Sequence, residues 1–258
     1  MEKIIFFGNG PLADYALSVL SQSFEIIFHA REKSDLLIVK KMKKEHPEAH
    51  GVLASFGVMI KEDVLELFEP EGILNIHPSL LPLYRGASPI ESAILAGDND
   101  FSVSIMKLVL AMDAGPVYAQ ITLNGLELNK DNIYRNLAER GAKWIVENIN
   151  DLPEPFLQDE KKATFTTKMD KTMSLLTPET DTAEQTFRKI VAYQGYPKPK
   201  YSFFSLPCIV LEAHILKQGE AAVLTIPCAD GHEVAVDRLQ PEGRKAMDAK
   251  SFINGYKH

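Results

Sequence analysis

Cysteine is scarce in this chain of 258 residues, which contains only Cys208 and Cys228. Neither cysteine belongs to a C-x-x-C pair or to a spacing typical of metal ligands. Two isolated thiols also give no disulfide framework of the kind found in small secreted proteins. We therefore expect a reduced, cytoplasmic protein in which both thiols are structural.

Several other signatures are missing. No apolar run reaches the roughly 18 residues that a transmembrane helix needs, and the apolar part of the opening MEKIIFFGNG is too short for a secretory signal. We therefore expect no contact with a membrane. The histidines form no H-E-x-x-H motif and no pair at metal-ligand spacing, so we also expect no metal. Neither G-x-S-x-G nor a P-loop occurs, so acyl-serine chemistry and phosphoryl transfer lack their usual signatures.

The chain also lacks an excess of positive charge, because its net charge is −7. By itself this value argues against a nucleic-acid partner. The charge is uneven, however: residues 1–160 carry 14 Lys/Arg against 24 Asp/Glu, and residues 161–258 carry 14 against 11. The difference indicates separate roles for the two parts, with the second part better suited to face phosphates.

Strand-like apolar segments alternate with helical segments through the first 150 residues. Strands are expected at 3–8, 24–30, 51–57, 72–74, 101–110 and 116–123, and helices at 11–20, 34–46, 61–68, 89–97 and 129–150. This alternation predicts βαβ units and an α/β fold with a Rossmann-like, mainly parallel sheet flanked by helices.

The remainder of the chain has a different pattern. Two prolines and a change of charge at 151–163 mark a linker, so we expect domains at 1–160 and 161–258. The second domain begins with a helix at 182–193, and short strands and turns are expected after it. The strands lie at 208–216, 220–227 and 232–239, a spacing that predicts a small OB-like β-barrel.

Asn75 and His77 follow the fourth expected strand and precede a loop bracketed by Pro78 and Pro82. Ligands of open α/β sheets bind at the carboxyl ends of strands, and alternation points both side chains the same way if the strand continues. An amide and an imidazole N–H can together hold an oxygen that becomes negative during a reaction. On three residues alone, a capping asparagine and a structural histidine are the more ordinary interpretation.

Two further patterns allow alternative interpretations. Residues 8–13 fit the dinucleotide fingerprint G-x-G-x-x-A, but the acidic residue that should end the second strand, Glu32, comes late. We favour a tight strand–helix turn over a nicotinamide site. The lysine cluster at 40–44 indicates either a solvated helix end, which we favour, or a phosphate contact.

The longer segment NIHPSLLPLYRG (75–86), followed by MDAGPVY (112–118), resembles the folate-dependent formyltransferase family. Members of that family transfer a formyl group from 10-formyltetrahydrofolate to an amine. The resemblance implies catalytic roles for Asn75, His77 and Asp113. It also implies contacts with the reduced folate from Phe56, Gly57, Ser79, Leu80, Leu81 and Pro82.

The second half resembles the members of this family that formylate methionyl-initiator tRNA. The resemblance lies in ATFTTKMDK (163–171), TAEQTFRKIVAYQGYPKPKYSF (182–203) and RLQPEGRKAMDAKSF (238–252). It implies a cytoplasmic, monomeric enzyme of translation initiation whose OB-like domain helps to bind tRNA. The expected tRNA contacts are Lys40, Lys41, Lys43, Lys44, Arg85, Lys198, Lys200, Arg244 and Lys245.

Two departures from that pattern keep other acceptors open. The long basic loop that such members carry after the second strand is missing, and Pro78 matches glycinamide ribonucleotide formyltransferases, which lack the second domain. A sugar-nucleotide N-formyltransferase would share the three catalytic residues but should lack the RLQPEGRKAM ending. A dehydrogenase and a non-catalytic RNA-binding protein are the alternatives from other classes.

Overall fold

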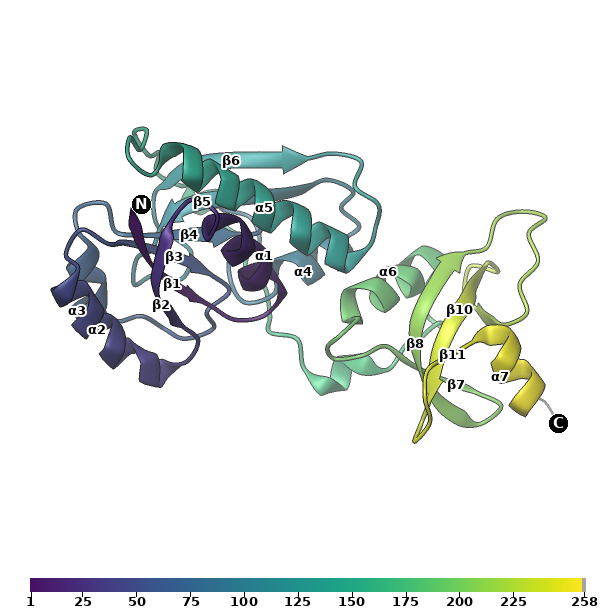
Figure 1. Cartoon of the computed structure of the whole chain (residues 1–258). Helices are drawn as coiled ribbons and strands as arrows, with labels where there is room; N and C mark the ends of the chain where they lie inside the picture. Colours follow the sequence, from purple (N-terminus) through teal and green to yellow (C-terminus); the bar gives the residue numbers. More distant parts are fainter. Residues whose placement is uncertain (257–258) are drawn as a thin grey trace. The chain divides into compact units, whose positions relative to one another are not determined.

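The computed structural model describes residues 1–256 and divides into two compact units (Figure 1). The first unit comprises Met1–Ile90 and Asn99–Thr167. The second comprises Glu91–Asp98 and the described residues from Lys168 onward. Helix α4 (Pro89–Ala96) therefore contributes most of its length to the second unit.

The first unit is built on a six-stranded sheet in the order β2-β1-β3-β4-β5-β6. The strands are β1 (Lys3–Gly8), β2 (Glu25–Ala30), β3 (His50–Ala54), β4 (Ile73–His77), β5 (Phe101–Lys107) and β6 (Val117–Leu123). Strands β1 to β4 pair in parallel, whereas β5 pairs antiparallel with both β4 and β6. The central strands consist of apolar residues because helices cover both faces of the sheet.

Helices pack on the two faces of this sheet (Figure 1). They are α1 (Pro11–Leu20), α2 (Leu36–Glu45), α3 (Glu62–Leu65) and α5 (Lys130–Asn148). The 3-10 turns of the first unit are η1 (Lys33–Asp35), η2 (Glu66–Phe68) and η3 (Glu160–Lys162). On one face, a Cβ added to Gly141 of α5 would lie 2.7 Å from Ile76 Cγ2. On the other face, Ile73 belongs to a core shared with α2 and α3. Because strand side chains alternate, Asn75 and His77 lie on the face of Ile73, opposite α5.

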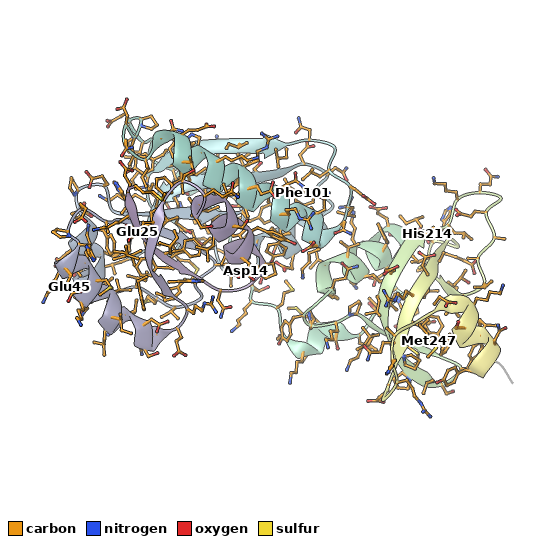
Figure 2. The ribbon with its side chains drawn as sticks, viewed as in Figure 1. Asp14, Glu25, Glu45, Phe101, His214 and Met247 are labelled. Carbon is orange, nitrogen blue, oxygen red and sulfur yellow. The ribbon has the colours of Figure 1, made fainter. Side chains whose placement is uncertain are left out.

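The side chains follow this layering (Figure 2). Phe101, at the start of β5, is 3% exposed, whereas Asp14 on α1 and Glu45 on α2 lie at the surface. The burial of the strands and the exposure of the outer helix faces agree with the amphipathic patterns in the sequence.

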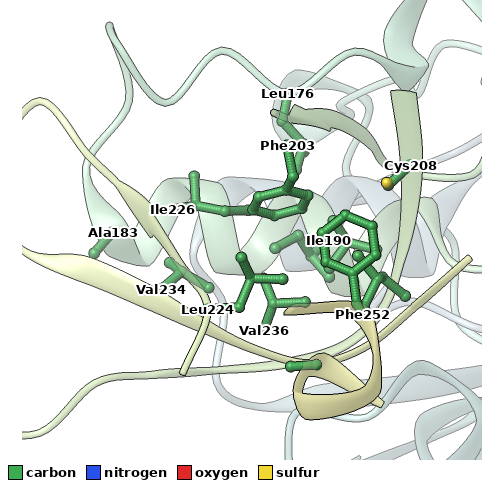
Figure 3. Packing of buried hydrophobic residues seen from close by; sticks show 13 residues of the cluster. Leu176, Ala183, Ile190, Phe203, Cys208, Leu224, Ile226, Val234, Val236 and Phe252 are labelled. Carbon is green, nitrogen blue, oxygen red and sulfur yellow. The ribbon is translucent and has the colours of Figure 1, made fainter. Parts of the chain in front are cut away.

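The second unit contains an antiparallel sheet in the order β11-β10-β8-β7, with β9 also paired to β10. Its elements are η4 (Lys171–Ser174), α6 (Ala183–Tyr193), β7 (Lys200–Phe203), β8 (Leu206–Ile215), β9 (Thr225–Pro227), β10 (Glu233–Pro241), β11 (Met247–Asp248) and α7 (Ala249–Tyr256). Ile190 of α6 and Phe252 of α7 enter one apolar core with sheet residues such as Val234 and Val236 (Figure 3). The predicted fold class, a Rossmann-like α/β sheet followed by a small OB-like β domain, is confirmed.

Two expected elements need correction. The sequence pattern predicts only strands and turns after 193, yet residues 249–256 form α7, because the Asp248 carboxylate accepts hydrogen bonds from the Ser251 N–H and hydroxyl, both at 2.8 Å. The strand expected at 220–227 is present only at 225–227. The residues before it turn at Gly219, where φ is 83°, and Glu220 accepts a hydrogen bond from Lys217 N.

Candidate active site

Strand β4 ends at His77 and brings two polar side chains into the sheet. Asn75 lies opposite Met106 of β5 and His77 lies opposite Ser104. Both side chains are buried, with 4% and 5% of their residue surfaces exposed. The strand thus continues through both residues, and their spacing of two places both side chains on one face.

Asp113 reaches this face from the turn between β5 and β6. Its backbone is left-handed, with φ at 47°, a conformation that aspartate tolerates better than most residues. A Cβ on Gly115 would lie 1.8 Å from the carbonyl oxygen of Lys107, so only glycine lets the turn lie against β5. The Asp113 Oδ2 atom accepts a hydrogen bond from Gly86 N at 2.8 Å, which fixes the direction of the carboxylate.

The three predicted catalytic side chains come together within the first unit. Asp113 Oδ1 lies 3.6 Å from His77 Nδ1 and 3.5 Å from Asn75 Nδ2. His77 Nε2 lies 3.1 Å from the carbonyl oxygen of Tyr84, which can only accept, so Nε2 carries a proton and Nδ1 faces Asp113. This arrangement can donate hydrogen bonds to an oxygen that gains charge and can accept a proton nearby.

The loop after His77 is held by hydrogen bonds from side chains of β5 and β6 and from its own Ser79. Ser104 Oγ donates to the carbonyl oxygen of Ser79 at 2.6 Å and accepts from Leu81 N at 3.1 Å. Gln120 Nε2 donates to the carbonyl oxygen of Leu81 at 2.6 Å, and Ser79 Oγ donates to that of Leu83 at 2.6 Å. Neither Ser104 nor Gln120 was predicted as a site residue, because a serine and a glutamine inside strands belong to no motif.

The residues predicted to contact folate differ in exposure. Leu80 presents 40% of its surface, whereas Leu81 is 3% exposed and packs with Met106 and Val117. Phe56 is 5% exposed and belongs to the core, and the following Gly57 has φ at 68°. Pro82 follows a cis peptide bond and is partly buried. Leu80 is therefore the large apolar side chain of residues 79–82 that is exposed.

Arg85 does not face solvent, contrary to the expectation that it contacts tRNA. It is 2% exposed, and its guanidinium donates to Glu160 Oε1 and Oε2 at 2.7 and 2.9 Å. The same group donates to Gln158 Oε1 from Nε at 3.1 Å and from Nη2 at 2.7 Å. A buried cation is stable only with such partners, and these partners occupy the atoms that would bind a phosphate.

The predicted basic cluster on α2 divides into two kinds of lysine. Lys40 pairs with Asp63, and Lys43 donates to the carbonyl oxygens of Pro47 and Ala49 at 2.5 and 2.7 Å. Burial lowers the pKa of Lys43. Lys41 and Lys44 are exposed, with Lys41 3.8 Å from Glu45. Of this cluster, Lys41 and Lys44 are the members at the surface.

The basic residues expected to bind tRNA in the second unit are exposed: Lys198, Lys200, Arg244 and Lys245. Lys200 also lines a hollow of about 160 Å³ together with Gln240 and Glu242.

Among residues 1–256, no cluster of three or more His, Cys, Asp or Glu side chains could hold a metal ion. Within the same range, no helix combines the length and apolar character needed to cross a membrane.

A Rossmann-like unit that gathers an amide, an imidazole and a carboxylate near the end of a strand carries the groups with which an acyl-transfer enzyme stabilises an oxyanion and moves a proton. The sequence comparisons specify the group. The family model "Formyl transferase" matches residues 11–149, and "Formyl transferase, C-terminal domain" matches residues 168–257. The chain belongs to the formyl transferase family, and it is a formyltransferase of the folate-dependent kind.

Two curated relatives are methionyl-tRNA formyltransferases. The one from Dehalococcoides mccartyi (strain ATCC BAA-2266 / KCTC 15142 / 195) is 33% identical over 225 residues, covering 80% of this chain and 70% of the relative. One from Thermus thermophilus is 31% identical over 261 residues, covering 95% and 82%. The similarity thus extends through both units.

Two solved structures share the fold. The methionyl-tRNA formyltransferase from Clostridium thermocellum has a TM-score of 0.65 at 20% identity, covering 93% of this chain and 98% of that one. WlaRD, a sugar 3N-formyl transferase solved with dTDP and 5-N-formyl-THF, has a TM-score of 0.67 at 16% identity, covering 95% and 99%. At these identities the likeness concerns the fold alone.

Proposed function

We propose that this protein transfers the formyl group of 10-formyltetrahydrofolate to the amino group of methionyl-initiator tRNA in the cytoplasm. The observation that carries the proposal is the approach of the Asp113 carboxylate to within 3.6 Å of His77 Nδ1 and 3.5 Å of Asn75 Nδ2. The names of the relatives at 31–33% identity support the choice of acceptor. The second family match, at residues 168–257, supports it as well, because both units take part in the similarity.

In the proposed reaction, the methionyl α-amine attacks the formyl carbon that N10 of the folate carries. A C–N bond forms, and the carbonyl oxygen becomes negative in a tetrahedral intermediate. Asn75 Nδ2 donates to that oxygen, and so does Nδ1 of His77 in its doubly protonated form, because the Nε2–H is already bonded to the carbonyl oxygen of Tyr84. One such donor typically lowers the barrier by about 3 kcal/mol. Asp113 accepts the proton that the attacking amine loses and passes it to N10. The oxyanion then returns to a carbonyl as the bond between N10 and the formyl carbon breaks, which leaves the formylated amine and tetrahydrofolate.

The proposed folate site lies along the loop after β4. Leu80, at 40% exposure, provides an apolar wall, and the backbone of residues 79–82 provides polar groups at fixed positions. Ser104 and Gln120 fix those positions through their hydrogen bonds to Ser79 and Leu81. A binding loop that is already ordered loses little conformational entropy when the ligand binds.

The proposed tRNA contacts are the exposed cations. In the second unit these are Lys198, Lys200, Arg244 and Lys245, and on α2 they are Lys41 and Lys44. Lysine and arginine side chains at a surface neutralise phosphates and release counterions, which is the main source of affinity for a nucleic-acid backbone. Arg85 is not included, because its guanidinium is bound to Gln158 and Glu160.

A sugar-nucleotide N-formyltransferase is the second candidate. The observation in its favour is the shared fold with WlaRD, which extends over 95% of this chain and 99% of that one. Both candidates use the same donor and the same three side chains, so only the acceptor separates them.

The test is an acceptor comparison with the full chain and 10-formyltetrahydrofolate. Methionyl-tRNA, an amino-sugar nucleotide and glycinamide ribonucleotide are supplied separately, and formylated products are measured by mass spectrometry. We expect formyl-methionyl-tRNA, with kcat/KM at least about a hundredfold above that for the other amines. Formylation of the sugar or of the ribonucleotide alone would overturn the proposed acceptor.

A further inference from the structure

The segment at 156–166, most of which falls in the predicted linker at 151–163, forms backbone hydrogen bonds with residues next to the candidate site. Phe156 and Val117 exchange two backbone hydrogen bonds, of 2.9 and 3.0 Å, just after the turn that carries Asp113. Arg85 N donates to Thr164 O at 2.9 Å, and Thr166 N donates to Arg85 O at 2.7 Å. All of these residues belong to the first unit. The segment therefore binds both loops of the candidate site.

Gln158 lies near the start of this segment and binds the backbone of the Asp113 turn. Its Nε2 donates to the carbonyl oxygens of Asp113 and Gly115, both at 2.8 Å. Its Oε1 accepts from two nitrogens of Arg85, at 3.1 and 2.7 Å. Carbonyl oxygens only accept and a guanidinium only donates, so this network admits one orientation of the amide.

The same network reaches His77 and the Asp113 carboxylate through three consecutive residues, 84–86. The carbonyl oxygen of Tyr84 accepts from His77 Nε2, the Arg85 side chain donates to Gln158, and Gly86 N donates to Asp113 Oδ2. Arg85 is 2% exposed and has its charge balanced by Glu160, so it forms a rigid link between the two loops. A displacement of Gln158 would therefore shift the Asp113 turn relative to His77.

We infer that Gln158 is a positioning residue for the catalytic carboxylate, and that Arg85 acts through it. The inference rests on the proposed function, in which Asp113 accepts the proton of the amine. Asp113 is held in left-handed backbone, at φ 47°, and such a conformation persists only where surrounding groups determine it. The two hydrogen bonds from Gln158 are direct restraints on that turn. They set where the carboxylate stands when the amine attacks.

The test replaces Gln158 with Glu in the full chain. The variant Gln158→Glu keeps the shape and the acceptor for Arg85, but it places an oxygen against the carbonyl oxygens of Asp113 and Gly115. Gln158→Ala removes both interactions. Asp159→Asn is the matched control, because this neighbouring side chain is exposed and touches none of the catalytic residues.

We expect both Gln158 variants to lower kcat for formyl transfer by about tenfold to a hundredfold, because a displacement near 1 Å can have that effect. KM values for 10-formyltetrahydrofolate and for methionyl-tRNA should stay within about twofold of the original protein, since the binding surfaces are unchanged. Asp159→Asn should keep the original kcat. Unchanged kcat in a folded Gln158→Glu variant would overturn the inference.

A double-mutant cycle with Asp113→Asn separates positioning of Asp113 from a general structural role. In single-turnover measurements, Gln158→Glu should change the residual rate of Asp113→Asn by less than about twofold, because residues acting as one unit are not additive. An equal loss in both backgrounds would assign Gln158 a role elsewhere and reject the inference. If Asp113→Asn itself keeps full turnover, the proposed catalytic role of Asp113 fails instead. Should Gln158→Glu not fold, Gln158→Asn, one methylene shorter, replaces it with the same expected results.

Discussion

At the scale of single residues, the candidate site depends on a carboxylate in an unusual backbone conformation. Asp113 has φ at 47°, and its two oxygens face different groups: Oδ2 accepts from Gly86 N, and Oδ1 faces His77 and Asn75. Alanine at this position would lose the charge and would also tolerate the left-handed backbone less well. Asparagine tolerates that backbone and keeps an oxygen acceptor, so it isolates the role of the charge.

Asp113→Asn should therefore lower the turnover of formyl transfer by about a hundredfold or more, which is the usual range for removal of a general base. The unfolding temperature should remain close to that of the original protein, because the hydrogen bond from Gly86 can persist. Steady-state rates with methionyl-tRNA and thermal unfolding by circular dichroism are the two measurements. Near-original turnover in a folded variant would remove Asp113 from the mechanism.

At the scale of elements, the site depends on how closely the turn after β5 approaches that strand. Gly115 lies so near Lys107 that a Cβ would stand 1.8 Å from its carbonyl oxygen and 3.0 Å from its carbonyl carbon. Lys107 N also donates to the carbonyl oxygen of Pro116 at 2.9 Å. The close packing of this turn against β5 thus explains the Gly-Pro at 115–116. The packed turn also sets the direction of the Asp113 carboxylate.

Gly115→Ala should lower the free energy of unfolding by about 2–4 kcal/mol, because the atom it meets belongs to the backbone and cannot rotate away. Turnover should fall with it, since the Asp113 turn must move. Chemical denaturation and kcat are measured together. The control is Gly255→Ala in α7, where the added Cβ has nothing within 4 Å and alanine favours the helix, so stability should be equal or slightly higher. Equal stability of Gly115→Ala would contradict the packing argument.

At the scale of the whole molecule, charge is divided between the two parts of the chain. The net charge of −7 combines an acidic stretch at 1–160 with a slightly basic one at 161–258. The proposed tRNA contacts in the second unit, among them Arg244 and Lys245, are exposed. Both residues belong to the second unit, whereas the three predicted catalytic side chains belong to the first, so binding of tRNA and the chemical step should respond to different substitutions.

The double variant Arg244→Ala/Lys245→Ala should raise the KM for methionyl-tRNA and reduce the slope of log KM against log salt by about one to two, because two phosphate contacts are lost. The KM for 10-formyltetrahydrofolate should not change. The measurement is a salt series of steady-state rates, with Lys217→Ala as the control for loss of an exposed charge in the same unit. An unchanged slope would show that these two residues do not face the tRNA backbone.

The sequence by itself determined the order of strands and helices in the first unit, the class of fold, and the family. Those features follow from local apolar periodicity and from a motif whose residues are contiguous, such as 75–86. It did not reveal α7, because the cap at Asp248 and the buried Phe252 matter only when the helix packs on the sheet.

Tertiary structure decided how the separate pieces of the site meet. Asn75 and Asp113 are 38 positions apart, and their approach depends on antiparallel pairing of β5 and on the close turn at Gly115. Gln158 lies in a segment that local composition marks only as a linker, yet it binds Asp113 and Arg85. The burial of Arg85 was equally invisible, since an arginine in a loop sequence normally faces water. Contacts between distant segments leave no pattern in the local sequence. The periodicity of apolar residues shows which face of a helix or strand is buried, but not which other segment covers that face.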